Sequence, residues 1–315
     1  MVNINRLGLG CMGMNRSNER RSIDTIRAAL DAGITLFNTG EFYGAGESEL
    51  VVGEALKGVP RDRYFLSVKF GVLPQPGGGI YGLDVKPFNV KAHLVYSLKR
   101  LGLDYVDLYQ PARMDESVPV EELTAALADL VKEGYVRHIG LTQIGPETLR
   151  RANAVHPVHT AELEYSLAER GVEKETLETA RGLGVNVLAF GALAHGLLSD
   201  RVLEDAARPH IPTGMFAPEN LPANRELVRA LKKIAEEKET TVSNLALAWT
   251  FAKYPFVSSL IGTTSPAHLN ESIEALKLDL TEEDVKRIER AFPAEQVKGA
   301  GMRNFVFRDG KMGLA

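Results

Sequence analysis

Short strand-like runs alternate with amphipathic helical stretches along the whole chain, and this alternation limits the possible folds more than any other feature. Parallel βα units produce this pattern, because a parallel strand needs a crossover connection before the next strand. We expect strands at eight apolar runs: 6–10, 34–38, 64–70, 105–110, 136–142, 161–166, 186–191 and 257–262. Helices are expected near 20–32, 47–57, 89–101, 120–133, 146–153, 173–183, 224–236, 242–253, 266–276 and 282–291.

Eight strand–helix units in 315 residues indicate an α/β fold of the (β/α)8, or TIM-barrel, type, with a single domain over residues 1–315. Two Rossmann-like halves would need a linker or a change of composition near the middle, and residues 140–175 show neither. Three segments are longer than ordinary loops: 71–87, 192–222 and the tail from 292. In a barrel the first two would lie on the C-terminal face, where active sites are built.

The stretch GLGCMG, from Gly8 to Gly13, fits the dinucleotide-binding fingerprint G-x-G-x-x-G. That motif binds a pyrophosphate where a buried strand leads into the first glycine and a helix opens at the third. Here the preceding residues VNINRL are partly polar, and no apolar helical period begins before Ile23. The match therefore does not predict a phosphate-binding loop.

Composition and charge argue against several classes of function. The net charge is −4, and no cluster of Lys and Arg alternates with aromatic residues, so no nucleic-acid partner is expected. The absence of a bilayer-length apolar run and of a leader pattern predicts a cytoplasmic protein without membrane contact. The histidines lack metal-ligand spacing, so no metal is expected, and Cys11 is interpreted as a packing residue. The sequence carries no signal for an oligomeric state.

Two residues near the ends of the second and third expected strands suggest acid–base chemistry. Lys69 lies within an apolar strand, where an unpaired charge is costly, and Tyr43 stands five residues after Asn38 at the end of the preceding strand. A buried lysine near a tyrosine lowers the pKa of the phenol, which can then exchange a proton near neutral pH. Alternatively, Lys69 extends to the rim of the barrel and Tyr43 only packs, and spacing alone does not separate these readings.

A series of motifs resembles the aldo-keto reductases, in order and over essentially the whole chain: RLGLGCMGM, FNTGEFYGAGESELVVGEAL, SVKFG, SLKRLGLDYVDLYQPARMD, LVKEGYVRHIGLT, RANAVHP, EYSL and IGTTSPAHLNES. The resemblance implies a (β/α)8 barrel that binds NADP(H) across its C-terminal face, without a metal ion and without a Rossmann fold. It also implies that GLGCMG forms the first barrel strand and the loop after it.

The resemblance implies a catalytic tetrad of Asp, Tyr, Lys and His, and this chain keeps two of the four. Tyr43 matches the general acid and Lys69 matches its pKa-lowering partner. Asn38 stands at the aspartate position, so a carbonyl oxygen replaces a negative charge. Ala112 stands at the histidine position, and loss of one such hydrogen-bond donor typically costs about 10²- to 10³-fold in rate. In having alanine at this position, the chain resembles a subgroup similar to the pyridoxal reductases. The alanine is therefore compatible with an aromatic aldehyde as substrate.

The resemblance also assigns residues to the nicotinamide end of the cofactor. Thr142, Gln143 and Glu162 correspond to the residues that hold the nicotinamide amide, usually Ser-Asn and Gln. Glu162 can accept a hydrogen bond from the amide NH₂ but cannot donate to its oxygen unless it is protonated. Phe190 corresponds to the aromatic residue that stacks on the nicotinamide ring, and the alternative is that it belongs to the strand core.

Two further segments correspond to the phosphate sites of NADP(H). The backbone of GALAHGLL, with Gly191 and Leu193, would flank the pyrophosphate. The segment IGTTSPAHLNES would hold the 2′-phosphate end through Gly262, Thr263, Thr264, His268, Glu271 and Ser272. The Lys and Arg of NADP-preferring relatives fall here on Gly262 and His268, so both permanent cations are missing. We expect a modest preference for NADPH over NADH, which weakens as the pH rises and His268 loses its charge, with NAD(H) as the alternative cofactor.

Three hypotheses for the function follow. The first is NADP(H)-dependent reduction of an aldehyde or ketone to an alcohol, in which Tyr43 protonates the carbonyl oxygen. The second is a cofactor-binding protein with weak turnover and a redox-sensing or partner-binding role, since two tetrad positions are substituted. In the third the enzyme works mainly as an alcohol dehydrogenase. Joint retention of Tyr43 and Lys69 favours an enzyme, and the small-molecule carbonyl substrate is not specified by the sequence.

Overall fold

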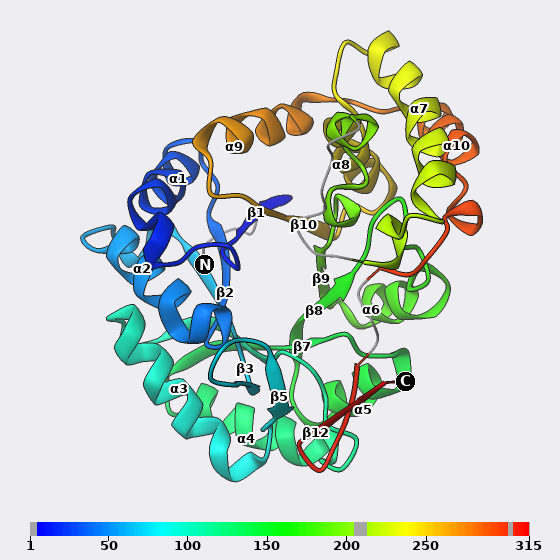
Figure 1. The fold of residues 1–315 in the computed structure, drawn as a ribbon. Helices are drawn as coiled ribbons and strands as arrows, with labels where there is room; N and C mark the ends of the chain where they lie inside the picture. Colours follow the sequence, from blue (N-terminus) through cyan, green and yellow to red (C-terminus); the bar gives the residue numbers. More distant parts are fainter. Residues whose placement is uncertain (1–4, 205–212, 302–304, 315) are drawn as a thin grey trace.

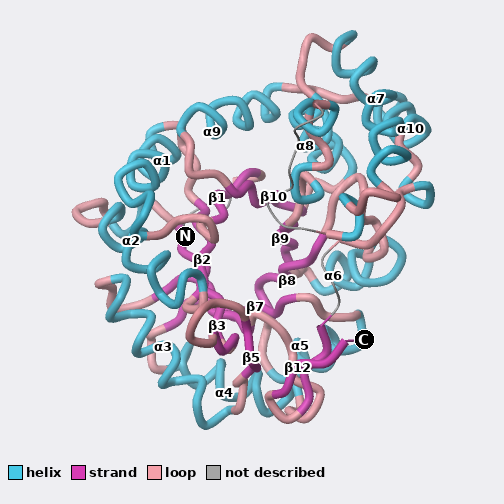
Figure 2. Tube along the Cα trace, in the orientation of Figure 1, coloured by secondary structure: helices cyan, strands magenta, loops and turns pink. Residues whose placement is uncertain are grey.

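The computed structural model describes residues 5–204, 213–301 and 305–314. Eight parallel strands close into a barrel, and helices surround it (Figures 1 and 2). Around the barrel the strands are β1 (Leu7–Gly10), β10 (Val257–Gly262), β9 (Asn186–Phe190), β8 (Val158–Glu164), β7 (Val136–Thr142), β6 (Val106–Pro111), β3 (Phe65–Phe70) and β2 (Leu36–Gly40). The predicted (β/α)8 fold is confirmed, and GLGCMG does contribute to the first barrel strand.

The strand boundaries lie close to the predicted ones, and the largest shift is at the start of β8. This strand begins at Val158 instead of Ala161. The residue before Pro157 is restricted to extended conformations, and His156 has φ −151° and ψ 141°. The chain therefore passes directly from helix into strand at this point.

The helices cover the outside of the barrel, as the amphipathic pattern predicts (Figure 2). The α-helices in the described residues are α1 (Glu19–Asp31), α2 (Glu47–Leu56), α3 (Pro87–Leu101), α4 (Val120–Lys132), α5 (Pro146–Val155), α6 (Glu178–Leu183), α7 (Leu221–Glu237), α8 (Val242–Lys253), α9 (Pro266–Ile273) and α10 (Glu282–Ala291). The predicted helix 173–183 is divided into a π turn, Glu173–Leu177, and α6. Within the described residues, no helix combines the length and apolar character that a membrane crossing requires.

The helix α8 is buried on almost every side, and its sequence explains why. The stretch NLALAWTF within it is apolar around the whole helix, in contrast to the one-sided apolar stripe of α1. Both α7 and α10 pack against α8, so it lies between the barrel and a second layer of helices (Figure 1). These two helices are additional to the one-helix-per-strand pattern.

Side chains that face the barrel interior alternate along each strand, and this alternation positions the polar residues. Five apolar residues form an interior cluster: Leu36, Phe65, Leu108, Leu188 and Leu260. Since side chains on a strand repeat every two residues, the next inward layer toward the carboxyl ends contains Asn38, Ser67 and Gln110. The barrel interior thus changes from an apolar layer to a polar layer that lies nearer the carboxyl ends of the strands.

A small antiparallel sheet lies outside the barrel and does not follow from the sequence pattern. Two of the long segments expected as loops form it, and its strands follow the order β11 (Phe305–Arg308), β12 (Lys311–Leu314), β5 (Ile80–Leu83) and β4 (Val72–Pro74). The two hairpins meet where Lys311 pairs with Gly82. The C-terminal hairpin is therefore held beside the segment that follows β3 (Figure 1).

Candidate active site

A pocket of about 380 Å³ opens at the carboxyl ends of the barrel strands. Nine residues singled out from the sequence line it: Asn38, Tyr43, Lys69, Ala112, Glu162, Phe190, Gly191, Leu193 and Gly262. The others lie outside this lining: Thr142, Gln143, Thr263, Thr264, His268, Glu271 and Ser272. Apolar atoms provide most of the wall, including those of Phe42, Val72, Leu260 and Phe307.

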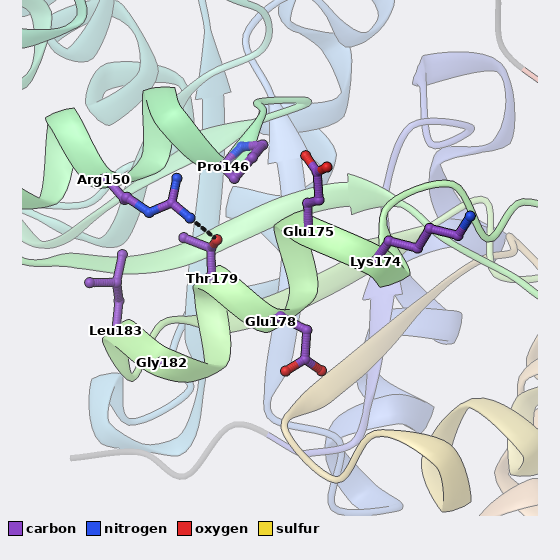
Figure 3. Close-up of a pocket in the computed structure, with 8 residues that line it drawn as sticks. All are labelled: Pro146, Arg150, Lys174, Glu175, Glu178, Thr179, Gly182 and Leu183. Atoms are coloured by element: carbon purple, nitrogen blue, oxygen red, sulfur yellow. Dashed lines mark hydrogen bonds between the residues drawn. The ribbon is translucent and has the colours of Figure 1, made fainter.

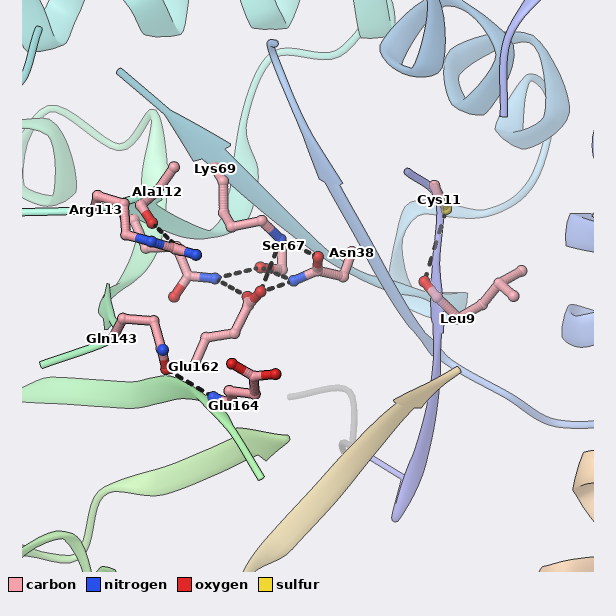
Figure 4. Close-up of polar contacts among 11 residues, drawn as sticks. Leu9, Cys11, Asn38, Ser67, Lys69, Ala112, Arg113, Gln143, Glu162 and Glu164 are labelled. Atoms are coloured by element: carbon pink, nitrogen blue, oxygen red, sulfur yellow. Dashed lines mark hydrogen bonds and ion pairs between the residues drawn. The ribbon is translucent and has the colours of Figure 1, made fainter. Parts of the chain in front are cut away.

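A network of buried polar side chains forms the base of this pocket, and we call it the floor: Asn38, Ser67, Lys69, Gln110 and Glu162. The ammonium of Lys69 donates to Glu162 Oε1 at 2.8 Å and also to the side-chain oxygen of Asn38, Oδ1. Glu162 Oε2 accepts from Asn38 Nδ2 at 2.7 Å and from Gln110 Nε2 at 2.5 Å. Figure 4 shows Asn38 from β2, Ser67 and Lys69 from β3, and Glu162 from β8 pointing toward one another. Lys69 therefore has the partner that its burial requires.

Glu162 has a different environment from the one the sequence suggests. The resemblance assigns it to the nicotinamide amide, but its carboxylate accepts from three donors within the floor, and the residue is 2% exposed. The contact between Lys69 and Glu162 joins residues 93 positions apart. The inward positions of Ser67 and Gln110 follow from the period-two pattern, and this signal could have included them among the candidates.

Tyr43 lies at the pocket wall, directly after Phe42, whose ring packs edge-on against it with centroids 4.6 Å apart. The Lys69 ammonium lies 5.2 Å from the centroid of the Tyr43 ring. Burial raises the pKa of the Tyr43 hydroxyl, and although the charge of Lys69 lowers it as predicted, the net direction is upward. The expected lowering toward neutral pH is thus corrected, because burial outweighs the lysine. Tyr43 keeps its proton and is suited to act as an acid.

Ala112 lies at the carboxyl end of β6, on the wall of the pocket near Tyr43. Its methyl group offers no hydrogen bond, and the next residue, Arg113, places a guanidinium at the same wall. Arg113 donates to the carbonyl oxygen of Ala112 at 2.7 Å and lies 5.8 Å from the centroid of the Phe190 ring. Sequence reasoning missed Arg113, although its place next to the substituted position could have pointed to it.

Thr142 is the last residue of β7 and Gln143 follows it, beside Glu162 of the floor. The hydroxyl of Thr142 is buried and has no hydrogen-bond partner in the described part of the protein. Gln143 has a left-handed backbone with φ 51°, and its side-chain oxygen accepts from the backbone N–H of Glu164 at 2.7 Å. An orphaned hydroxyl at this depth is costly, and a ligand that bonds to it would remove the cost.

The loop after β9 turns sharply around the mouth of the pocket. Gly191, Ala194 and His195 all have positive φ, at 64°, 46° and 56°. Since alanine and histidine rarely adopt this conformation, the loop is held by its contacts, and His195 Nε2 lies 2.9 Å from Glu164 Oε1. The loop is therefore fixed in place beside Phe190, Gly191 and Leu193.

The segment after β10 meets a residue that the sequence did not indicate. Arg201, in the short turn Asp200–Leu203, donates from Nη2 to His268 Nε2 at 2.9 Å. The expectation that no permanent cation remains at this end is corrected, because a loop 67 residues away in sequence supplies one. Thr263 Oγ1 accepts from the N–H of Ser265, Ser272 donates to the His268 carbonyl, and Glu271 is exposed.

A second hollow lies on the outside of the barrel, between α5 and α6 (Figure 3). Its charged side chains, including Lys174, Glu175 and Glu178, are exposed, and the hydrogen bond drawn there joins Arg150 to Thr179 at 3.0 Å. Nothing in it resembles the buried network of the floor. In the part of the chain that the structure describes, no group of His, Cys, Asp or Glu is arranged to hold a metal.

Cys11 is buried beside β1, and it donates a weak hydrogen bond to the carbonyl of Leu9 (Figure 4). Burial raises the pKa of its thiol to about 12. A thiol in this environment is not nucleophilic at neutral pH, which agrees with its interpretation as a packing residue.

Comparison with known proteins identifies the family. Residues 6–292 match the Aldo/keto reductase family. A probable aldo-keto reductase 1 from Glycine max is 34% identical in an alignment of 313 residues that covers 96% of this chain and 89% of the relative. A glycerol dehydrogenase structure from Gluconobacter oxydans superposes with a TM-score of 0.85 at 27% identity, over 96% of this chain and 95% of that chain. The structure of an aldo-keto reductase from Klebsiella pneumoniae in complex with NADPH superposes with a TM-score of 0.73 at 25% identity, over 92% of each chain. This chain belongs to the aldo/keto reductase family.

Proposed function

We propose that this protein is an NADP(H)-dependent oxidoreductase that reduces an aldehyde or ketone to an alcohol, with all 315 residues forming one barrel domain. One observation carries the proposal: Tyr43 lines an apolar pocket with its ring 5.2 Å from the ammonium of Lys69, and that ammonium is paired with Glu162. A proton donor next to a fixed positive charge is what the reduction of a carbonyl group requires from a protein.

The residues present fit a nicotinamide cofactor. The orphaned hydroxyl of Thr142 can bond to the nicotinamide amide, with Gln143 beside it, and Phe190 offers an aromatic surface for the ring. Gly191 and Leu193 would flank the pyrophosphate, and Gly262, Thr263, Thr264, His268, Glu271 and Ser272 would line the adenine end. When bound, NADPH supplies a hydride to the carbonyl carbon of the substrate.

Tyr43 would donate its proton to the substrate oxygen as the negative charge develops there. Lys69, held by Asn38 and Glu162, would stabilise the resulting phenolate. Burial raises the pKa of Tyr43, so the hydroxyl is protonated at neutral pH and available as a donor. Ala112 contributes no donor, and Arg113 supplies charged N–H groups at that wall.

The substrate we propose is an aromatic aldehyde such as pyridoxal. The pocket wall is mainly apolar, and alanine at position 112 leaves room where a larger side chain would project. The resemblance of this position to pyridoxal reductases supports the same substrate class. Arg201 next to His268 supports a preference for NADPH over NADH, since the 2′-phosphate carries the additional negative charge.

A second candidate function is cofactor binding with weak turnover, in a sensing or partner-binding role. The observation in its favour is Ala112, which leaves the substrate oxygen without one orienting donor. A reaction mainly in the oxidative direction is the third, and similarity to a glycerol dehydrogenase makes glycerol a reasonable alcohol to test.

The test is a panel assay of the whole protein. NADPH oxidation is followed with small aliphatic aldehydes, aromatic aldehydes and pyridoxal, and NADP⁺ reduction is followed with glycerol and the matching alcohols. We expect measurable reduction that is fastest with an aromatic aldehyde. Tight NADPH binding with no turnover on any member of the panel would support the cofactor-binding function instead.

A further inference from the structure

The ammonium of Lys69 is buried at the centre of the molecule and needs a negative charge that position 38 does not provide. The side chains of Lys69 and Glu162 are 4% and 3% exposed. An unpaired ammonium at such a depth would be strongly destabilising or would lose its proton. Among the residues that the structure describes, Glu162 is the carboxylate that forms an ion pair with Lys69.

Glu162 reaches Lys69 across the barrel. Glu162 is on β8 and Lys69 is on β3, with β7 and β6 between them on the shorter side of the barrel, so the contact is not between neighbouring strands. Asn38 completes the arrangement because its carbonyl oxygen accepts from Lys69 while its NH₂ group donates to Glu162 at 2.7 Å. Figure 4 shows the three side chains converging.

The direction of each hydrogen bond in the floor depends on a pure acceptor at position 162. Asn38 Nδ2, Gln110 Nε2 and Lys69 Nζ are all donors, and a carboxylate can accept from all three. A glutamine there would turn one NH₂ group toward at least one of these donors. An aspartate at position 38 would put two carboxylates against one ammonium, with no NH₂ between them.

We propose that Glu162 is a positioning residue, whose carboxylate supplies from β8 the negative charge that holds Lys69 beside Tyr43, in place of a carboxylate at position 38. The proposal rests on the proposed function as a reductase. It assigns to Glu162 a role in the acid–base centre rather than in holding the nicotinamide amide.

The charged groups around Tyr43 give the sign of the expected change. Lys69 from β3, Glu162 from β8 and Arg113 after β6 act on the Tyr43 hydroxyl, and Glu164 acts on Arg113. Burial lowers the pKa of Lys69, but Glu162 and Tyr43 together raise it by more, and Glu162 also raises the pKa of Tyr43. Removing the carboxylate charge therefore lowers the pKa values of both Lys69 and Tyr43. The fall in activity at alkaline pH should then begin at a lower pH than in the unmodified protein.

The test is a cycle of Glu162→Gln, Asn38→Asp and the double variant, measured against the unmodified protein. NADPH dissociation constants, kcat and KM over pH 6–10, and thermal unfolding midpoints are determined for all four. Each single variant should lose about 10²-fold in kcat, since it disturbs a preorganised charge, and Glu162→Gln should move the alkaline limb to lower pH. The double variant should recover most of the rate, and the alkaline limb of its pH–kcat profile should return toward that of the unmodified protein. The reason is that the carboxylate introduced at position 38 would then pair with Lys69. NADPH affinity should change little throughout.

Three outcomes would overturn the proposal. One is that Glu162→Gln keeps the original rate and pH profile. Another is that the double variant is no better than the worse single variant, and a third is that only the unfolding midpoints fall while the alkaline limb stays in place. If the unmodified protein does not oxidise NADPH with any aldehyde, the proposed function fails instead. In that case the thermal unfolding midpoints still test the pairing of Lys69 with Glu162, because they should fall in both single variants and recover in the double variant.

Discussion

The floor and the rim of the pocket are built from different parts of the sequence. By the rim we mean the loop 191–203 after β9, the segment 262–272 after β10 and the small sheet. The floor comes from inward positions of barrel strands, and its contacts are buried, with several donor–acceptor distances between 2.5 and 3.1 Å. The rim comes from loops and from the small sheet outside the barrel, and its contact between Arg201 and His268 is exposed.

This difference separates two tasks. The floor places charge and a proton donor at fixed positions, so a change there should alter kcat more than binding. The rim surrounds the pocket mouth, so a change there should alter dissociation constants or KM and leave the chemical step intact.

Replacement of Tyr43 by Phe should abolish most carbonyl reduction while NADPH binding stays nearly intact. The change removes the proton donor that the floor supports, and general acid catalysis contributes about 10²- to 10⁴-fold in rate. Turnover assays and fluorescence titration of NADPH measure the two quantities separately. A Phe variant that keeps most of its rate would show that Tyr43 is not the acid.

Replacement of Arg201 by Ala should weaken NADPH binding by about 10- to 100-fold, as expected for one charge-assisted hydrogen bond to a phosphate. NADH affinity and kcat with saturating NADPH should not change, because NADH lacks the 2′-phosphate. His268→Ala is the matched control and should have a smaller effect, since its Nε2 already accepts a hydrogen bond from Arg201. Equal losses for NADPH and NADH would contradict the assignment of Arg201 to the phosphate.

Replacement of Ala112 by His should raise the turnover of small aliphatic aldehydes by about tenfold, by adding a donor near the substrate oxygen. The same change should slow bulky aromatic aldehydes, because the larger side chain occupies the pocket wall. The ratio of kcat/KM for the two substrates measures both effects. A loss of rate with every aldehyde would indicate that the wall has been rebuilt around the alanine and Arg113.

The smallest effect concerns Asp115, which fastens the C-terminal hairpin to the barrel. Its carboxylate accepts from the backbone N–H groups of Gly310 at 2.6 Å and Asp309 at 3.1 Å, and Phe307 of this hairpin lines the pocket. Asp115→Asn should raise the substrate KM by about fivefold, equivalent to about 1 kcal/mol. The cofactor dissociation constant should remain the same.

The pH dependence of this contact has a definite sign. Burial would raise the pKa of Asp115, but hydrogen bonds from Ser117, Gly310 and Asp309 together lower it by more, and the pKa lies below its ordinary value. The contact is therefore fully formed above about pH 4 and is lost as the pH falls further. Hydrogen exchange of the Gly310 amide should rise at low pH relative to neighbouring amides in the unmodified protein. In the Asn variant this dependence should disappear, and an unchanged profile would refute the role of Asp115.

The floor was the more predictable region because strand periodicity is local. Apolar runs located the eight barrel strands, and the positions of Asn38 and Lys69 within two of them followed from these runs. The partner of Lys69 did not, because Glu162 is 93 residues away and meets it only when the barrel closes. Asn38 considered alone indicates only the loss of a carboxylate, and Glu162 considered alone indicates only the gain of one. The two changes are seen to be related only when both residues are found beside Lys69.

The rim was poorly predicted because loops have no period. Nothing in the local sequence indicates that Arg201 reaches His268, or that Lys311 pairs with Gly82 to join two hairpins. The left-handed backbone at Ala194 and His195 is likewise unexpected, since these residue types do not favour it. Such features depend on tertiary contacts that are formed only in the complete fold.

Transfer of a labelled hydrogen from NADPH to the substrate distinguishes a pocket that carries out reduction from one that only binds the cofactor. The protein is incubated with an aromatic aldehyde and NADPH that carries two deuterium atoms at nicotinamide C4, and the alcohol product is examined by mass spectrometry and NMR. We expect one deuterium on the carbinol carbon of the alcohol made by the unmodified protein, and very little product with Tyr43→Phe. Tight binding of NADPH without labelled alcohol would contradict this expectation.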